Sequence, residues 1–190
     1  MKLGVYGGSF DPVHLGHLLV AQAAIEELGL DKLFFVPAAQ SPFKPENKMT
    51  PAPFRLKLLR LALASKTNCD VDDQEIRRGG ISYAIETLRD YAKRFPQANL
   101  FYLIGADNIS KLNEWREANQ LAEIAEFAAI PRPGGTPAEF PKPFRGRILK
   151  GFPFDLSSSK IRVRVKTGLP IENLAPPFVA EAIRAAQIYV

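Results

Sequence analysis

A glycine-rich turn near the start of the chain restricts the fold more than any other feature. Residues 2–6 are predicted to form a short buried strand, and the turn Gly7–Pro12 follows directly. Asp11 and Pro12 are typical of the N-cap and the first position of a helix, so we expect a helix to begin there. The pattern therefore predicts a strand, a tight turn and a helix in immediate succession.

Both histidines of the 190-residue chain, His14 and His17, lie in this predicted helix. Three positions apart, they share one face in the first two turns, where unpaired backbone N–H groups and the helix dipole favour anions. Gly16 between them costs helix stability, so we expect another group to pack tightly over it. This arrangement predicts a phosphate site.

Two other interpretations of the histidine pair stay open. The rings could simply cap a surface helix, or they could form half of a zinc site. A zinc site needs more ligands than this pair and the single cysteine, Cys69, supply. Phosphate binding is therefore the leading hypothesis.

A second helix opening near residue 158 carries similar chemistry. Ser157, Ser158 and Ser159 are N-cap candidates, and Lys160 and Arg162 follow them. The backbone N–H groups of this opening could meet phosphate, and the guanidinium of Arg162 presents a planar fork to phosphate oxygens. The alternative is a solvated basic helix that begins with serine.

Composition restricts the class of protein. With 46% hydrophobic and 24% charged residues, the chain suits one globular domain over 1–190, with a C-terminal helical part from about 158. One cysteine excludes an internal disulfide framework, and no early apolar segment suits a signal peptide or a membrane span. We therefore expect a cytoplasmic protein without a membrane partner. The net charge of +5 comes from scattered Lys and Arg, which favours small anionic substrates over nucleic acid.

The rest of the chain alternates between strand and helix patterns. Further strands are expected at 32–36, from Val71, at 99–104, 126–130 and 147–150, and helices at 54–64, from Ser82 as N-cap, near Ser158 up to Gly168, and near Pro176. The alternation predicts an α/β, Rossmann-like parallel sheet flanked by helices. In such sheets ligands bind outside the carboxyl ends of the strands, where the glycine turn, the loop after Val36 and the Gly105 loop would meet. Two proline-rich segments, 37–53 and 131–143, are expected to be loops beside this edge.

The segment Gly8–His17, Gly-Ser-Phe-Asp-Pro-Val-His-Leu-Gly-His, resembles the signature of the nucleotidylyltransferase superfamily. Within it the chain is most similar to bacterial nicotinate-nucleotide adenylyltransferases. The similarity runs nearly end to end, through segments 42–44, 82–88, 105–107 with Trp115, 132–134 and 157–162. The first and last motifs are the most specific.

This resemblance implies adenylyl transfer from ATP, carried with Mg²⁺, to nicotinate mononucleotide, with no metal site on the protein itself. It implies catalytic roles for His14, His17, Lys44 and Arg162. It implies ATP contacts from Gly7, Gly8, Ser9, Phe10, Gly105, Asp107, Ser158, Ser159 and Ile161, and contacts to nicotinate mononucleotide from Tyr83, Ala84, Trp115, Arg116 and Arg132. Asp107 has a structural alternative, as the cap of a helix after Gly105.

Three positions depart from the family pattern. Phe43 stands where histidine is usual, Ala84 where threonine is usual, and Ser159 in place of a threonine whose hydroxyl serine retains. A related enzyme, such as pantetheine-phosphate adenylyltransferase or glycerol-3-phosphate cytidylyltransferase, is the nearest alternative function. A nucleotide-binding regulator without turnover is another. The preference for nicotinate over nicotinamide mononucleotide and the formation of a homo-oligomer stay open.

Overall fold

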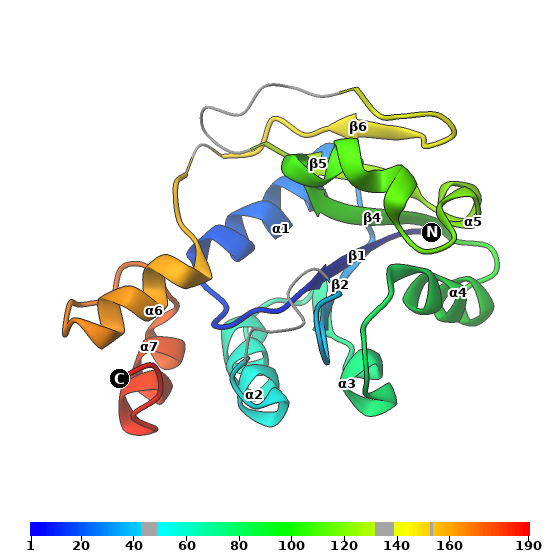
Figure 1. Cartoon of the computed structure of the whole chain (residues 1–190). Helices are drawn as coiled ribbons and strands as arrows, with labels where there is room; N and C mark the ends of the chain where they lie inside the picture. The colour runs from blue at the N-terminus through cyan, green and yellow to red at the C-terminus, as the bar shows by residue number, and fades with distance from the viewer. Residues whose placement is uncertain (43–48, 132–138, 153) are drawn as a thin grey trace.

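A six-stranded parallel sheet forms the centre of the computed structural model, which describes residues 1–42, 49–131, 139–152 and 154–190 (Figure 1). The strand order is β3-β2-β1-β4-β5-β6. The strands are β1 (Lys2–Gly8), β2 (Lys32–Pro37), β3 (Cys69–Val71), β4 (Asn99–Gly105), β5 (Glu126–Ile130) and β6 (Gly146–Ile148). This arrangement confirms the predicted Rossmann-like parallel sheet.

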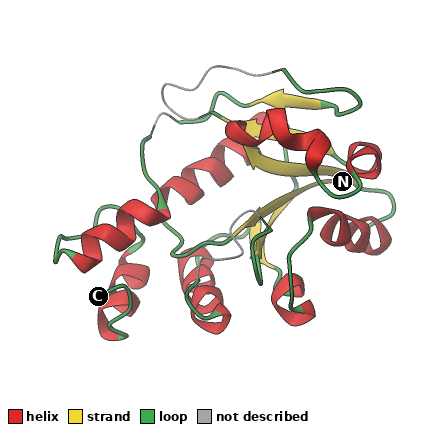
Figure 2. Cartoon of the chain, in the orientation of Figure 1, coloured by secondary structure: helices red, strands yellow, loops and turns green. Residues whose placement is uncertain are grey.

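Helices cover both faces of the sheet (Figure 2). They are α1 (Leu15–Leu28), α2 (Ala52–Leu63), α3 (Gln74–Arg78), α4 (Ala84–Arg94), the 3-10 helix η1 (Ala106–Glu114), α5 (Ala118–Ile124), α6 (Ser158–Lys166) and α7 (Pro177–Ala185). α6 and α7 lie beside the start of α1, away from the sheet (Figure 1). The short helices α3 and α5 were not predicted from the sequence.

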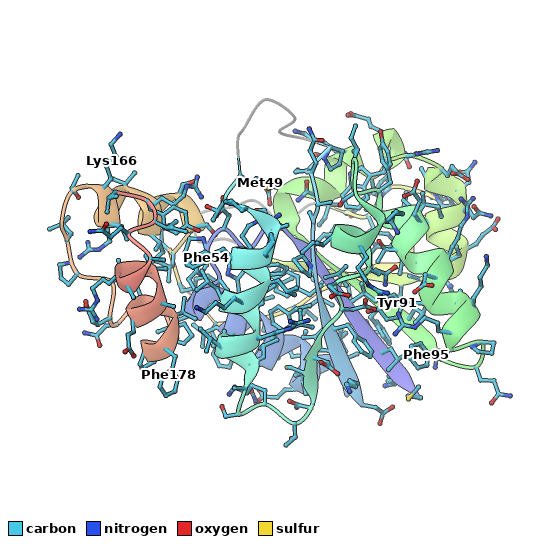
Figure 3. All side chains as sticks on the ribbon, turned by 90° about the horizontal axis from the view of Figure 1, so that it is seen from below. Met49, Phe54, Tyr91, Phe95, Lys166 and Phe178 are labelled. Atoms are coloured by element: carbon cyan, nitrogen blue, oxygen red, sulfur yellow. The ribbon has the colours of Figure 1, made fainter. Side chains whose placement is uncertain are left out.

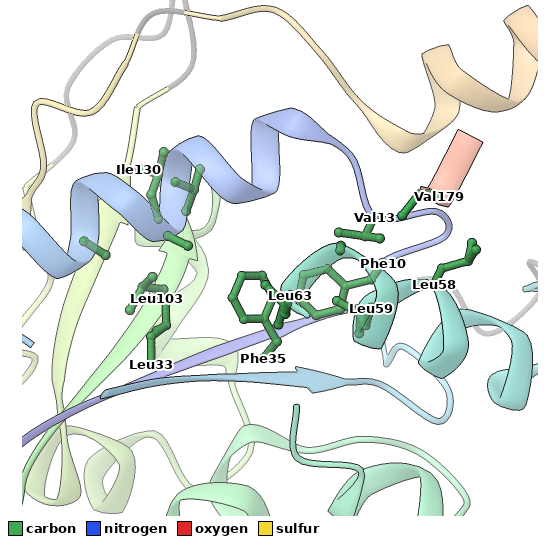
Figure 4. Close-up of a cluster of buried hydrophobic side chains, with 14 of the residues drawn as sticks. Phe10, Val13, Leu33, Phe35, Leu58, Leu59, Leu63, Leu103, Ile130 and Val179 are labelled. Carbon is green, nitrogen blue, oxygen red and sulfur yellow. The ribbon is translucent and has the colours of Figure 1, made fainter. Parts of the chain in front are cut away.

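Successive residues of each central strand enter opposite cores, which explains why the strands are continuously apolar. Phe35 and Leu103 pack with α1, α2 and α7 in one buried cluster (Figure 4). Val36 and Ile104 point the other way and pack with α4, η1 and α5. Tyr91 on α4 and Phe54 on α2 accordingly lie on different sides of the molecule (Figure 3).

The carboxyl ends of the central strands meet at one edge. Gly8 is paired with Pro37 across β1 and β2, and Gly105 with Ile130 across β4 and β5. The chain leaves β1 toward β2 and later returns to the other side of β1 as β4, so a topological switch point lies at the end of β1. The fold thereby brings together the loops that the sequence placed at this edge.

The starts of several elements differ from prediction, and three of these differences have a structural reason. The first helix begins at Leu15 with His14 as N-cap, and not at Asp11, because the Asp11 carboxylate binds distant groups and no N–H of the helix. α4 begins after Tyr83, since the Ser82 hydroxyl accepts the N–H of Ala39 and caps no helix. Val71 ends β3, which pairs with β2 from Cys69 onward.

Candidate active site

The two histidine rings lie in close, tilted contact at the opening of α1. His14 is the N-cap in extended backbone, and its N–H donates to Nδ1 of His17 over 3.1 Å. The two ring centroids are 3.8 Å apart. Because Nδ1 of His17 accepts a hydrogen bond, the neutral ring carries its proton on Nε2. The backbone thus fixes His17 as an Nε2–H donor.

Burial keeps both imidazoles uncharged at neutral pH. It lowers the pKa of His14 to about 4. The pKa of His17 also lies well below its usual value, first through burial and then through the neighbouring His14. Nδ1 of His14 is buried and, within the described ranges, makes no hydrogen bond. The pair can therefore serve an anion as neutral hydrogen-bond donors, whereas positive charge must come from other side chains.

Gly16 is closely covered, as its place in the sequence predicted. A Cβ at this position would lie 2.5 Å from the ring of Phe154 and 2.9 Å from the ring of His14. Phe154 comes from the loop before α6 and packs against the core of the α1 side. Sequence reasoning missed Phe154, because an isolated aromatic residue in a loop carries no periodic signal.

The opening of α6 is joined to the glycine-rich turn. The Ser157 hydroxyl caps α6 by accepting the N–H of Lys160 over 3.2 Å. Ser158 Oγ donates to the carbonyl of Pro12 over 2.9 Å. Arg162 Nη1 donates to the carbonyl of Asp11 over 2.7 Å. The two helix openings predicted to bind phosphate therefore stand side by side.

The remaining predicted residues of α6 differ in exposure. Ser159 is exposed, and its hydroxyl accepts from Arg162 Nη2 over 3.1 Å. The Ile161 side chain is fully buried in the core of the α1 side, and its N–H donates to the Ser157 carbonyl. Ile161 thus anchors the helix, while Ser159 and Arg162 present polar groups at its opening.

A cavity of about 460 Å³ opens at the carboxyl edge of the sheet, beside the turn. Eight of the residues predicted to contact substrates line it. These are Gly7, Gly8, Ser9, Tyr83, Ala84, Gly105, Trp115 and Arg116. His14, His17 and Arg162 are not among its lining residues. The site thus has two parts, a cavity and a pair of helix openings, which meet at the turn.

The opening of α4 forms one wall of the cavity. Tyr83 is the N-cap of α4 and Ala84 its first residue. The guanidinium of Arg116 lies 4.6 Å from the centre of the Tyr83 ring and pairs with Glu86 over 3.3 Å. Arg116 is thus held over the cavity wall by an aromatic ring and a carboxylate.

Trp115 contributes both to the core and to the cavity. It is half-buried and meets the rings of Tyr102 and Phe127 edge to face, at centroid distances of 6.2 and 6.3 Å. It also lines the cavity. One part of the indole therefore packs on the core, and another part is available to a ligand.

Glu75 is a cavity residue that sequence reasoning missed. Its buried carboxyl accepts from Thr87 Oγ1 over 2.5 Å, and burial raises its pKa despite this bond. It comes from α3, whose five residues are too few to display an apolar period. No local sequence pattern indicated that the wall of the predicted anion site contains a buried carboxyl.

Gly105 is the N-cap of η1, so the suggestion that Asp107 caps this helix is wrong. Asp107 is exposed, and a Cβ on Gly105 would lie 2.4 Å from its Oδ1.

Lys44 and Arg132, with the unusual Phe43, lie outside the described residues. In the described ranges, no group of three or more His, Cys, Asp or Glu side chains is placed to hold a metal ion. No helix in these ranges has the length and apolar character to cross a membrane.

Comparison with known proteins agrees with this geometry. Residues 5–164 match the model of the cytidylyltransferase-like family. A probable nicotinate-nucleotide adenylyltransferase of Opitutus terrae is 38% identical over 100% of this chain and 98% of its own. Another, from Methylacidiphilum infernorum, is 36% identical over 100% of this chain and 92% of its own.

A solved structure supports the fold. The Plasmodium falciparum nicotinic acid mononucleotide adenylyltransferase complexed with NaAD superimposes with a TM-score of 0.81 at 20% identity, covering 99% of this chain and 97% of that one. At this identity the match concerns the fold alone. The full-length sequence relatives and the family model show more: the chain belongs to the cytidylyltransferase-like family and, within it, to the nicotinate-nucleotide adenylyltransferases.

Proposed function

We propose that this protein transfers the adenylyl group of ATP to the phosphate of nicotinate mononucleotide, giving nicotinic acid adenine dinucleotide and pyrophosphate. One observation carries the proposal: Arg162 and Ser158 bind the carbonyls of Asp11 and Pro12, which joins the two helix openings predicted to bind phosphate beside one cavity. The names of the full-length relatives support the same reaction.

The triphosphate would lie across the two helix openings. His17 offers its Nε2–H, and His14 offers the proton of its neutral ring. Arg162 supplies a permanent positive charge, and Ser9 and Ser159 supply hydroxyl groups. Lys44 and the backbone of Gly7, Gly8 and Phe10 would complete the contacts that the family resemblance implies. ATP enters as its complex with a divalent cation, which we take to be Mg²⁺, so the metal belongs to the substrate.

Nicotinate mononucleotide would occupy the cavity. Its volume of about 460 Å³ is in the usual range for a small-molecule site. The backbone N–H groups at the start of α4, around Tyr83 and Ala84, suit a carboxylate, because a helix opening favours negative charge. Since a backbone N–H does not depend on the side chain, alanine in place of threonine is compatible with this contact. Trp115 offers a ring face to the pyridine, and Arg116 adds positive charge.

The chemistry needs positioning and charge stabilisation. The acceptor phosphate is an anion at neutral pH, so it can attack the α-phosphorus without a general base. The bond from the α-phosphorus to the bridging oxygen breaks as the new bond forms, and pyrophosphate leaves with the bonding electrons. Donors at the two helix openings stabilise the negative charge that develops on the phosphate oxygens. This explains why the two helix openings present hydrogen-bond donors.

A pyrophosphate-release assay tests the proposal. ATP and CTP are each paired with nicotinate mononucleotide, nicotinamide mononucleotide, pantetheine phosphate and glycerol 3-phosphate. We expect the highest kcat/KM with ATP and nicotinate mononucleotide. Comparable kcat/KM for the nicotinamide compound would refute the acid preference. Tight ATP binding without pyrophosphate release from any pair would instead favour a regulatory role.

A further inference from the structure

A buried polar cluster lies directly behind the glycine-rich turn, and the reaction as described does not use it. It consists of Asp11, Thr50, Arg55 and Tyr189, and we call it the Asp11 cluster. Asp11 is 6% exposed and Arg55 only 1%. Charged groups are rarely buried this deeply unless hydrogen bonds compensate for the lost water. Their bonds therefore indicate what the cluster is built to hold.

Arg55 binds the turn, and Asp11 is part of it. Arg55 Nη1 donates to the Ser9 carbonyl over 2.8 Å, and its Nε donates to the Thr50 carbonyl over 2.8 Å. The two ends of a trans peptide unit point in opposite directions, so the N–H of Phe10 points away from Arg55. Arg55 thereby sets the direction of a backbone donor in the turn. On the other side of Phe10, the Asp11 carboxylate accepts the N–H of Thr50 over 3.1 Å.

Tyr189 completes the cluster from the far end of the sequence. Its hydroxyl donates to Asp11 Oδ1 over 2.6 Å. Burial and the bond to Asp11 raise the pKa of Tyr189, so it stays a neutral donor. The carbonyl of the same Asp11 receives Arg162 from the α6 opening. Asp11 is thus held at its side chain by Tyr189 and at its backbone by a residue proposed to bind the triphosphate.

Phe10 in the turn and Tyr189 in the Asp11 cluster both have strained backbone conformations. Four non-glycine residues of the described chain have positive φ, and two of them are Phe10 at 46° and Tyr189 at 71°. Aromatic residues rarely adopt this conformation, and strain of this kind persists only where surrounding contacts hold it. The Phe10 ring is buried against Tyr6 and Phe35, and the hydrogen bonds of the Asp11 cluster hold the residues on either side of Phe10. The cluster therefore holds the turn in a conformation that the local sequence does not favour.

We propose that Tyr189 and Arg55 are positioning residues for adenylyl transfer, which act through the buried Asp11 cluster on the turn between the cavity and the two helix openings. Neither side chain needs to touch substrate. The inference rests on the proposed function of the turn, and it assigns the Tyr189 hydroxyl a role in the geometry of the bound triphosphate.

A second tyrosine provides a matched control. Tyr91 Oη donates to Asp72 Oδ2 over 2.8 Å, and Asp72 is 7% exposed and also binds Arg94. Tyr91→Phe therefore removes the same kind of bond, to an equally buried aspartate, on the other side of the sheet. Tyr189→Phe removes its counterpart at the turn and keeps the ring. Each removes one hydroxyl, so we expect urea unfolding to show a loss of stability of the same order in the two variants.

Turnover and nucleotide binding separate positioning from simple stabilisation. For Tyr189→Phe we expect kcat to fall about tenfold or more, because small misplacements of reacting groups are costly, while KM for nicotinate mononucleotide stays within about twofold. A non-hydrolysable ATP analogue should bind several-fold more weakly. Tyr91→Phe should leave both quantities within about twofold of the parent. Arg55→Lys, which keeps the charge and loses the fork, should reproduce the fall in kcat.

The outcomes distinguish the two proposals. Parent-like kcat and analogue binding in Tyr189→Phe would overturn the positioning role. Equal losses of kcat in the two tyrosine variants would overturn it as well. An inactive parent would overturn the proposed function. In that case binding of the ATP analogue still tests whether the Asp11 cluster positions the turn, because binding can be measured without turnover.

Discussion

Lowering the pH from 7 to 4 should destabilise this protein through His14. The residue is 4% exposed, and burial lowers the pKa of its imidazole from 6.5 to about 4. Below pH 6.5 the unfolded chain takes up a proton on this imidazole, whereas the folded chain does so only near pH 4. The free energy of unfolding therefore falls as the pH falls through this window and levels off below it. The difference in pKa corresponds to a loss of about 3 kcal/mol from His14.

The assay is urea unfolding at pH 7, 5.5 and 4.5, followed by the fluorescence of Trp115, the single tryptophan. His17 and the carboxylates also titrate, so the informative quantity is the difference between the parent and His14→Asn. Asparagine cannot gain a proton in this range and is a good N-cap residue. We expect the parent to lose about 2 kcal/mol more than the variant between pH 7 and pH 4.5. Equal losses in the two proteins would refute the burial argument for His14.

Three further predictions concern single side chains at the helix openings. His17→Ala should lower kcat by the equivalent of about 2.7 to 4 kcal/mol with little change in KM for ATP, and parent-like kcat would exclude a donor role. Gly16→Ala gains about 1 kcal/mol of helix propensity but overlaps the Phe154 ring, which costs about 1 to 3 kcal/mol. Urea unfolding should therefore show a net loss of up to about 2 kcal/mol, and a more stable variant would contradict the close contact. Ser157→Ala removes the acceptor for the Lys160 N–H and should cost about 1 kcal/mol in the same measurement, whereas an unchanged midpoint would show that the cap contributes nothing.

The sheet could be predicted from the sequence because its central strands are apolar on both faces. Residues 126–130 were predicted with their exact limits, and 99–104 to within one residue. The helices α3 and α5 escaped prediction because five and seven residues cannot display a helical period over two full turns. The single-domain organisation, the cytoplasmic location and a homo-oligomer stay predictions.

The local motifs of the site were visible in the sequence, whereas their supports were not. Asp11 followed by proline has the pattern of a helix start, but its partners Thr50 and Tyr189 are 39 and 178 positions away. Contacts between residues so far apart in the sequence leave no local pattern. These distant contacts, and not the local pattern, determine the role of Asp11. Phe154 over Gly16 and Glu75 in the cavity wall belong to the same class. The roles assigned to individual site residues stay predictions until the variants are measured.

The bond between Tyr189 and Asp11 also has a consequence for biosynthesis. Tyr189 is translated 178 residues after its partner Asp11. Until Tyr189 is available, the Asp11 carboxylate is solvated or binds another group. Closing so long a loop is slow compared with forming α1. Catalytic competence should consequently appear late in folding, after the sheet has formed.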